Sequence, residues 1–279
     1  MTEANSRSIG KVLVWVALAV AGMLVAGCAG RVSRLHIQEG TPWPALCRQL
    51  QNSWGKLNTF ESELRFSFNS ELGNVSGWGK IAYSRAGVLV VRLRGPLGVR
   101  AADVVATTDS LWVYVPFRNT LYVGATEEFR LARERPGEWV EVLFGRPVLG
   151  CEEPATWRPW GEKLLTIEQT DEVVSRRYVV NRESAEPREA SFAWGADRTV
   201  LVAYESPNRL GGCLIARLVR VKSDSPKMRL AIAYRQPRVN GRINWRRYRV
   251  NFPHSARRVP LRSVFLVSEH IDSRLAEGD

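Results

Sequence analysis

The apolar positions of this chain follow three successive patterns along its 279 residues. Residues 12–27 carry no charge. Residues 44–57 repeat apolar side chains at every third or fourth position, which predicts one stripe of a helix. From residue 60 onwards apolar and polar residues alternate in short segments, which predicts β-strands. The expected protein is therefore mainly β with a few helices, of the α+β class.

Turn residues separate the alternating segments, which predicts a series of antiparallel hairpins. Strands are expected at residues 60–68, 78–83, 88–93, 101–107, 110–115, 121–123, 163–169, 173–180, 188–194, 199–204, 214–221, 228–234, 243–252 and 264–267. A second, short helix is expected at 138–144. No connection is long or polar enough for a domain linker. Residues 43–279 are therefore expected to form one strongly curved antiparallel sheet with one or two helices.

The strand expected at 110–115 is apolar on both faces, because Leu111 to Val115 are all apolar or aromatic. One face of an antiparallel sheet normally meets water. A strand without a wet face must be covered on both sides or must line a cavity. A covering helix and a cavity are both open at this stage.

The uncharged segment near the N-terminus predicts a signal peptide. Arg7 and Lys11 form a short positive region ahead of it. Its sixteen residues, 12–27, are too few to span a bilayer comfortably, since a spanning helix needs roughly 20 apolar residues. An ordinary membrane anchor that happens to end in cysteine is the alternative.

The segment ends Leu24-Val25-Ala26-Gly27-Cys28, which resembles the bacterial lipobox. This resemblance implies cleavage of residues 1–27, a diacylglycerol on the Cys28 thiol, and a lipidated tether over 28–42. The two or three acyl chains of such a lipoprotein make a firm membrane anchor. Ala29 stands where Asp would, in the familiar Gram-negative rule, retain the protein in the inner membrane. The expected location is therefore the outer membrane, facing the periplasm.

Three further cysteines, Cys47, Cys151 and Cys213, remain after lipidation. In an oxidising envelope one pair could form a disulfide and leave one thiol free, but the spacing does not identify the pair. The absence of a C-x-x-C spacing and the isolation of the three histidines argue against a metal site. We expect neither a metal nor another cofactor.

The formal net charge of +12 is concentrated in the C-terminal part of the chain. Residues 207–279 hold 16 Lys and Arg against 5 Asp and Glu. Such a region can attract anionic lipid head groups or another acidic component of the envelope. A plain solvated face is the alternative. A nucleic-acid partner is not expected, because a secreted lipoprotein rarely meets one.

Two short motifs in order resemble the LolB family of outer-membrane lipoprotein receptors, within the LolA–LolB superfamily. The first, at 94–98, reads Arg-Gly-Pro-Leu-Gly and joins two predicted strands. The second, at 139–147, ends the short helix in Gly-Arg-Pro. With a helix after the lipidated cysteine and hairpins between, this order covers roughly residues 43–205. It is equally similar to a group of uncharacterised envelope lipoproteins with the same fold.

The resemblance implies a half-open antiparallel β-barrel with helices that plug its mouth. Its apolar cavity would bind acyl chains or another lipoprotein and pass this cargo to the outer membrane. Periodicity suggests which residues line the cavity, and an ordinary filled core of the same residues is the alternative. The expected lining consists of Leu64, Phe66, Phe68, Ile81, Tyr83, Leu89, Val91 and Leu93 on the strands, with Val140, Leu143 and Phe144 on the helix.

In the LolB family the leucine of the Pro-Leu-Gly loop protrudes and helps push cargo into the membrane. The resemblance implies this role for Leu97. Pro96 stiffens the loop and Gly98 permits a tight turn, so an exposed leucine between them would insert readily into lipid. The alternative is that Leu97 folds back onto the core.

The chain departs from the LolB pattern beyond about residue 207, where some seventy residues follow that such a domain does not need. We expect these residues to extend the sheet. No Ser/His/Asp order, Gly-rich phosphate loop or recognisable carboxylate pair indicates an enzyme. The expected function is a non-catalytic carrier of acyl chains or lipoproteins. The alternative is a structural or assembly lipoprotein that docks anionic lipid or a partner protein through its basic C-terminal region.

Overall fold

The computed structural model describes residues 37, 40–71, 73–126, 138–172, 174–195, 198–224 and 227–261. Leu35–Asp279 form one compact unit. The signal peptide, Cys28 and the strand expected at 264–267 lie outside the described residues. Within these ranges, no helix has the length and apolar character that a membrane span requires.

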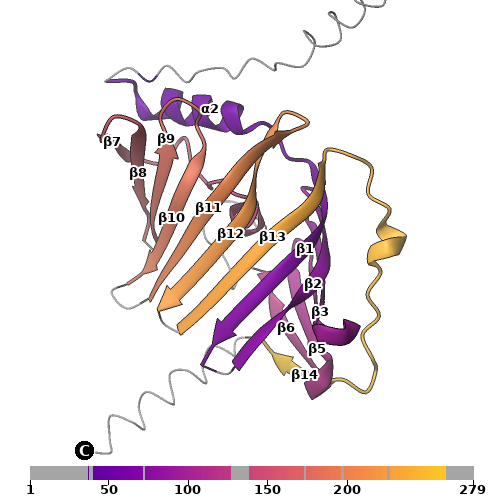
Figure 1. The fold of residues 1–279 in the computed structure, drawn as a ribbon. Helices are drawn as coiled ribbons and strands as arrows, with labels where there is room; N and C mark the ends of the chain where they lie inside the picture. The colour runs from indigo at the N-terminus through magenta and orange to yellow at the C-terminus, as the bar shows by residue number, and fades with distance from the viewer. Residues whose placement is uncertain are drawn as a thin grey trace, which may run out of the picture. The chain divides into compact units, whose positions relative to one another are not determined.

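The described residues form a single sheet of fourteen strands, with two α-helices and short 3₁₀ turns (Figure 1). The helices are α2 (Trp43–Trp54) and α3 (Glu138–Val142), and the 3₁₀ turns are η1 (Pro96–Gly98), η2 (Pro116–Arg118) and η4 (Trp245–Tyr248). The strands are β1 (Thr59–Ser70), β2 (Gly73–Ser84), β3 (Val88–Arg94), β4 (Arg100–Ala106), β5 (Ser110–Val115), β6 (Thr120–Ala125), β7 (Thr156–Trp160), β8 (Leu164–Thr170), β9 (Ser175–Asn181), β10 (Pro187–Trp194), β11 (Arg198–Leu210), β12 (Cys213–Asp224), β13 (Lys227–Val239) and β14 (Arg257–Pro260).

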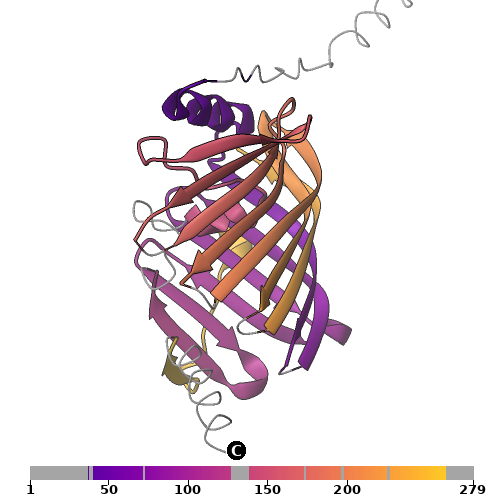
Figure 2. The same ribbon diagram turned by 90° about the vertical axis from the view of Figure 1, so that its left-hand side faces the viewer.

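The strand order is β14-β6-β5-β4-β3-β2-β1-β13-β12-β11-β10-β9-β8-β7. All neighbours are antiparallel except β14 and β6, which run parallel. The end strands β14 and β7 do not pair with each other, so the sheet is open. The two halves of the sheet cross over each other, β1–β6 behind and β8–β13 in front (Figure 2). The expectation of a mainly antiparallel β protein with few helices is thus confirmed.

The strands expected between residues 60 and 234 are all present, as β1 to β6 and β8 to β13. The helix expected at 44–57 is also present but ends at Trp54. Gly55 ends it with a φ of 70°, and its backbone lies so close to the carbonyl oxygen of Gly212 that a Cβ would meet that oxygen at 2.2 Å. The end of α2 is therefore set by a contact with the β11–β12 turn, which local periodicity does not report.

Within the described residues, the first part of the basic region belongs to the sheet as the end of β11 and the strands β12 and β13. Residue 207 lies inside β11, and β13 pairs with β1 over almost its whole length, with Leu64 opposite Tyr234 and Phe66 opposite Ile232. Strand β13 joins the two halves of the sheet through its pairing with β1. These strands alternate apolar residues inward with Arg and Lys outward, so the same segment supplies both core and positive charge.

The strand expected at 243–252 is wrong. The segment instead contains the 3₁₀ turn η4, which begins after Asn244. The side chain of Asn244 accepts a hydrogen bond from the backbone N–H of Arg246. Ile243 and Tyr248 pack against Ala82 and Val90 on the face of the sheet that points away from α3, here called the outer face. The apolar residues of this segment pack on the sheet. Its backbone adds no strand to the sheet (Figure 1).

Strand β5 shows why a strand can be apolar on both faces. Leu111 and Val113 point to the main core, while Trp112 and Tyr114 point to the outer face, where Phe252 packs on them. The cover on that side is the C-terminal segment and not a helix.

Two strands, β7 and β14, were not expected from the sequence. Strand β7 is mostly exposed and contains Pro159, so it lacks the alternation that marks a half-buried strand. Strand β14 has four residues and pairs only with β6. Both lie at the two ends of the sheet order, where only one neighbour imposes a pattern.

Candidate functional site

Helix α3 closes part of the inner face of the sheet, which is the face opposite the outer face. Phe144, just after the helix, is fully buried between the rings of Phe60, Tyr83 and Tyr234, with ring centroids 4.2, 5.5 and 5.9 Å away. The hydroxyl of Tyr234 donates to the carbonyl oxygen of Leu143 at 2.8 Å. Burial raises the pKa of Tyr234, so this donor stays protonated.

The Gly-Arg-Pro motif at 145–147 joins α3 to α2. Gly145 has a φ of 79°, and a Cβ there would lie 2.7 Å from the Cβ of Ala216. Arg146 is almost fully buried and pairs with Glu141 at 2.9 Å. Its Nη1 donates to the carbonyl oxygen of Trp54, at 2.7 Å, and its Nη2 to that of Gly55, at 2.6 Å. The guanidinium thus satisfies carbonyls at the C-terminal end of α2, where a positive charge is also favoured by the helix dipole.

This network borders a polar pocket of about 280 Å³, lined among others by Gln51, Lys56, Arg85, Glu141 and Arg146. Its polar character separates it from the apolar cavity that the sequence predicts.

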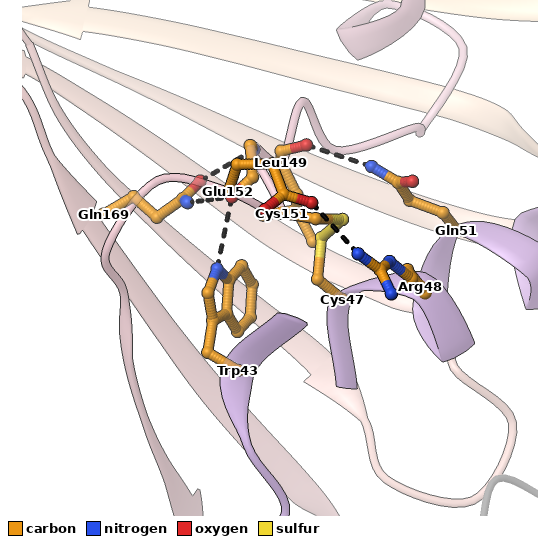
Figure 3. The surroundings of a disulfide bond; sticks show 9 residues. Trp43, Cys47, Arg48, Gln51, Leu149, Cys151, Glu152 and Gln169 are labelled. Atoms are coloured by element: carbon orange, nitrogen blue, oxygen red, sulfur yellow. Dashed lines mark hydrogen bonds and ion pairs between the residues drawn. A yellow bond between two sulfur atoms is a disulfide. The ribbon is translucent and has the colours of Figure 1, made fainter. Parts of the chain in front are cut away.

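The disulfide joins Cys47 of α2 to Cys151, across 104 residues of sequence (Figure 3). Cys213 is the buried free thiol. The pairing that the sequence left open is therefore decided by the position of α2 beside the segment that follows α3. Reduction of this bond would release a long covalent loop.

Hydrogen bonds surround the disulfide on both sides (Figure 3). The indole N–H of Trp43 donates to the carbonyl oxygen of Gly150 at 3.1 Å, and Gln51 donates to that of Leu149 at 3.0 Å. From β8, the Gln169 side chain both accepts from the N–H of Gly150 and donates to its carbonyl oxygen. The segment from 148 to 151 is thus held between α2 and the sheet.

Ten of the eleven residues expected to line a cavity belong to one apolar cluster on the inner face, and Phe68 is half-buried at the far end of β1. Seven of the ten are buried: Leu64, Phe66, Ile81, Tyr83, Leu89, Val140 and Phe144. Val91, Leu93 and Leu143 are partly buried against the same cluster. The seven buried side chains belong to the main hydrophobic cluster, to which α3 contributes Val140. Accessible apolar surface on the inner face comes instead from the partly buried residues.

The partly buried residues continue across the first half of the sheet as one row. Val91 of β3 lies opposite Val104 of β4, Val104 opposite Val113 of β5, and Val113 opposite Tyr122 of β6. All four are half-buried and pack against the main core. Because neighbouring strands lie about 4.8 Å apart, the row spans roughly 14 Å of apolar surface. Val104, Val113 and Tyr122 were not in the expected lining, although the alternation of their strands places them on the same face.

The Pro-Leu-Gly loop forms the turn η1 between β3 and β4. The side chain of Leu97 is 100 % exposed, so it does not fold back onto the core. Its φ is 57°, a left-handed conformation that costs a leucine about 1 kcal/mol or more. The N–H of Gly95 donates to the carbonyl oxygen of Val99 at 2.8 Å, and that of Gly98 to Gly95 at 3.3 Å. Both bonds hold the loop in a shape that presents Leu97 to solvent.

A larger hollow of about 910 Å³ lies on the outer face, between β6 and the C-terminal segment. It is lined by Trp112, Leu121, Val123, Val250, Asn251, Phe252, Pro253, His254, Arg258, Val259 and Pro260. It therefore lies on the opposite side of the sheet from the row of Val91, Val104, Val113 and Tyr122. Within the described ranges, no cluster of three or more His, Cys, Asp or Glu side chains is arranged to hold a metal ion.

No protein-family model matches this chain, and no curated protein matches it. Solved structures are similar in fold. A DUF1329 family protein from Desulfovibrio piger has a TM-score of 0.51 at 13% identity, over 77% of this chain and 95% of that chain. A putative outer membrane lipoprotein-sorting protein domain from Vibrio parahaemolyticus also has a TM-score of 0.51, at 8% identity, over 72% and 94%. A LolA superfamily protein from Nitrosomonas europaea has a TM-score of 0.49 at 10% identity, over 74% and 98%.

Sequence identities of 8 to 13% show a shared fold and do not show a shared function. The chain shares the fold of a lipoprotein-sorting domain, which is the LolA/LolB-like fold that its two short motifs led us to expect.

Proposed function

We propose that this chain is a lipid-anchored protein of the bacterial outer membrane, facing the periplasm, that binds acyl chains or lipoproteins on its inner face. It passes this cargo to the membrane without catalysis, by partition between hydrophobic sites. In this proposal the sheet acts as a half-open barrel and Cys28 carries the anchor.

The row of Val91, Val104, Val113 and Tyr122 carries this proposal. These side chains are in register on four adjacent strands and remain partly exposed. A contiguous apolar row of this kind offers a site for an apolar ligand. An extended acyl chain that lies across the strands would bury the row, at a gain of about 25 cal/mol per Å² of apolar surface removed from water.

The fold supports the same proposal, because one similar solved protein is itself described as a lipoprotein-sorting domain. Leu97 provides the contact with the receiving membrane. It is fully exposed on a turn that Pro96 and Gly98 shape, and an exposed leucine loses little by entering lipid.

The test of the binding site is uptake of a fluorescent fatty acid by residues 35–279. Val104→Ser should weaken uptake by about fivefold, because one half-buried apolar side chain contributes about 1 kcal/mol. Val105→Ser is the matched control, since this neighbouring valine is also half-buried but packs on the outer face. Equal effects of the two substitutions would contradict the assignment of the inner face.

Native mass spectrometry of the protein purified from bacterial membranes tests the cargo directly. The expected result is a bound lipid or lipoprotein. Recovery without either, together with failure to take up the fatty acid, would overturn the carrier function. For Leu97, Leu97→Glu should leave the protein folded and block transfer of cargo into liposomes.

A second candidate function is docking of an anionic lipid or partner protein through the basic C-terminal region. One observation favours it: exposed Lys222 of β12 lies directly opposite exposed Arg229 of β13. Like charges in this position repel each other. Asp224 pairs with Lys222 at 2.9 Å and offsets part of this repulsion, and a bound anion would relieve the rest. Binding of the protein to anionic vesicles that is abolished by Arg229→Glu, but not by Val104→Ser, would favour this function over the carrier.

A further inference from the structure

Two hairpin tips of the first half of the sheet lie at the same end. Strands β3, β4, β5 and β6 are consecutive antiparallel neighbours, so β3 and β5 run in the same direction and end on the same side. The turn η1 follows β3, and η2 follows β5. Turn η2 also contacts β4, the strand that leaves η1. Both turns lie at the lower end of the sheet in Figure 1, away from α2.

The second tip presents an aromatic ring to solvent. Phe117 of η2 is 78 % exposed. The tip is held in place from several sides: the N–H of Asn119 donates to the carbonyl oxygen of Pro116 at 2.9 Å, and the Asn119 side chain accepts from the hydroxyl of Tyr114 and donates to the carbonyl oxygen of Ser255. Most of this ring therefore faces solvent on a turn that is firmly held.

Positive charge surrounds both tips, and neither contains an acidic residue. The sequence of the first is Arg94-Gly-Pro-Leu-Gly-Val-Arg100, and that of the second is Val-Pro-Phe-Arg118-Asn-Thr. The Arg118 guanidinium lies over the Phe117 ring, 5.4 Å from its centroid, which is within the roughly 6 Å reach of a cation–π contact. The nearest carboxylate on β4, Asp103, is fully buried and paired with Arg92 and Arg100.

We propose that η1 and η2 together form one docking surface for a bilayer that contains anionic phospholipid. Phe117 is a second insertion point beside Leu97, and Arg94 and Arg118 bind the phosphates of the head groups. This inference shares Leu97 with the proposed function, but Phe117 and the two arginines go beyond it.

The chemistry of the tips favours a bilayer over a protein partner. Aromatic rings are stable at the boundary between head groups and acyl chains, where one side of the ring is apolar and the other wet. Arginine side chains beside them extend along the apolar surface and reach the phosphates. Since each arginine near an anionic surface strengthens binding by about fivefold, two of them with two inserted side chains suffice for docking that requires no cavity.

The experiment uses residues 35–279, which form a compact unit of their own. Binding is measured by co-sedimentation with vesicles of phosphatidylcholine alone and with vesicles of equal amounts of phosphatidylethanolamine and phosphatidylglycerol. Phe117→Ala should lower the partition coefficient on the anionic vesicles by about tenfold, as expected for an inserted aromatic side chain. Arg118→Gln should lower it by about fivefold on the anionic vesicles and leave binding to phosphatidylcholine unchanged.

Trp160→Ala is the matched control. Trp160 is also exposed, at 52 %, and also has a guanidinium over its ring, that of Arg177 at 5.6 Å. It is the last residue of β7, and β7 is the edge strand farthest in the strand order from β3 to β6, which carry η1 and η2. Trp160→Ala should leave vesicle binding unchanged. The docking surface is refuted if Phe117→Ala affects binding no more than Trp160→Ala does, or if the wild type does not bind anionic vesicles. In either case the two hairpin tips would be candidates for contact with a protein partner.

The outcome is separable from that of the carrier function. Phe117→Ala should not change fatty-acid uptake, which Val104→Ser reduces. Failure of uptake together with Phe117-dependent vesicle binding would refute the carrier and leave the docking surface standing. Fatty-acid uptake without Phe117-dependent vesicle binding would refute the docking surface and leave the carrier function standing. Thermal unfolding of each variant confirms that the fold is intact.

Discussion

Nη1 of Arg146 donates a hydrogen bond to the carbonyl oxygen of Trp54, 2.7 Å away, and so joins two segments that are 92 residues apart in sequence. The same guanidinium pairs with Glu141. The end of α2, the end of α3 and the close contact of Gly145 with β12 are thus organised around one buried cation. This arrangement gives the Gly-Arg-Pro motif a structural role that does not depend on any cargo.

Substitution of Arg146 should therefore lower stability strongly. Arg146→Met removes the partner of the poorly exposed Glu141 and leaves the carbonyl oxygens of Trp54 and Gly55 without their donor. Loss of one member of a buried ion pair costs about 3–5 kcal/mol. Urea unfolding measures the change. The double variant Arg146→Met with Glu141→Gln should recover part of the loss, and no recovery would contradict a role for the ion pair.

Reduction of the disulfide should lower the free energy of unfolding by about 2–5 kcal/mol, since Cys47 and Cys151 close a loop of 104 residues. Thermal unfolding with and without a reductant measures the effect. The double variant Cys47→Ser with Cys151→Ser is the control, because its melting temperature should not respond to the reductant. A response in that variant would point to Cys213 or to an unrelated effect.

Tyr204→Phe should leave stability unchanged or raise it by up to about 1 kcal/mol. The Tyr204 hydroxyl is buried and has no hydrogen-bond partner among the described residues, so its removal costs nothing and relieves a desolvation penalty. Tyr234→Phe is the matched control. It removes the donor to Leu143 and should destabilise the protein by about 1 kcal/mol. Equal losses for both variants in urea unfolding would contradict this difference.

Stability should fall as the pH rises above about 10. Burial raises the pKa of Tyr204 and Tyr234, and burial together with Glu141 raises that of Tyr83. In the unfolded chain these phenols ionise near pH 10, while in the folded protein they stay neutral to higher pH. The unfolded state therefore releases protons first, at about 1.4 kcal/mol per pH unit for each such tyrosine. Urea unfolding across this range measures the slope, which Tyr234→Phe should reduce.

Leu97→Asn should impair transfer of cargo without lowering the stability of the protein. Asparagine adopts the left-handed conformation more easily than leucine, so the folded protein should be as stable as the wild type or more stable by about 1 kcal/mol. Transfer of cargo into liposomes should nevertheless fall, because the exposed apolar side chain is gone. Transfer at the wild-type rate would show that Leu97 does not contact the receiving membrane.

The sequence by itself predicted those features that depend on neighbouring residues. A three- to four-residue period predicted a helix at 44–57, which is present as α2 (Trp43–Trp54). Short alternating or apolar segments predicted the strands from β1 to β13 except for β7. The Pro-Leu-Gly loop was correctly read as a turn, since Pro96 and Gly98 favour one. Lipidation of Cys28 and the tether stay predictions, because those residues lie outside the described part of the chain.

Only the tertiary structure decided which distant segments meet. The apolar alternation of β13 is compatible with many neighbours, and its place beside β1 follows from the pairing of Leu64 with Tyr234 across 170 residues. The same holds for Cys47, whose partner depends on where α2 lies, and for residues 243–252, whose apolar side chains cover the sheet without joining it. The patterns along the sequence did not single out Phe117. Periodicity reports which face of an element is apolar, while the partner of that face, and the apolar residues left without one, depend on packing between elements far apart in the chain.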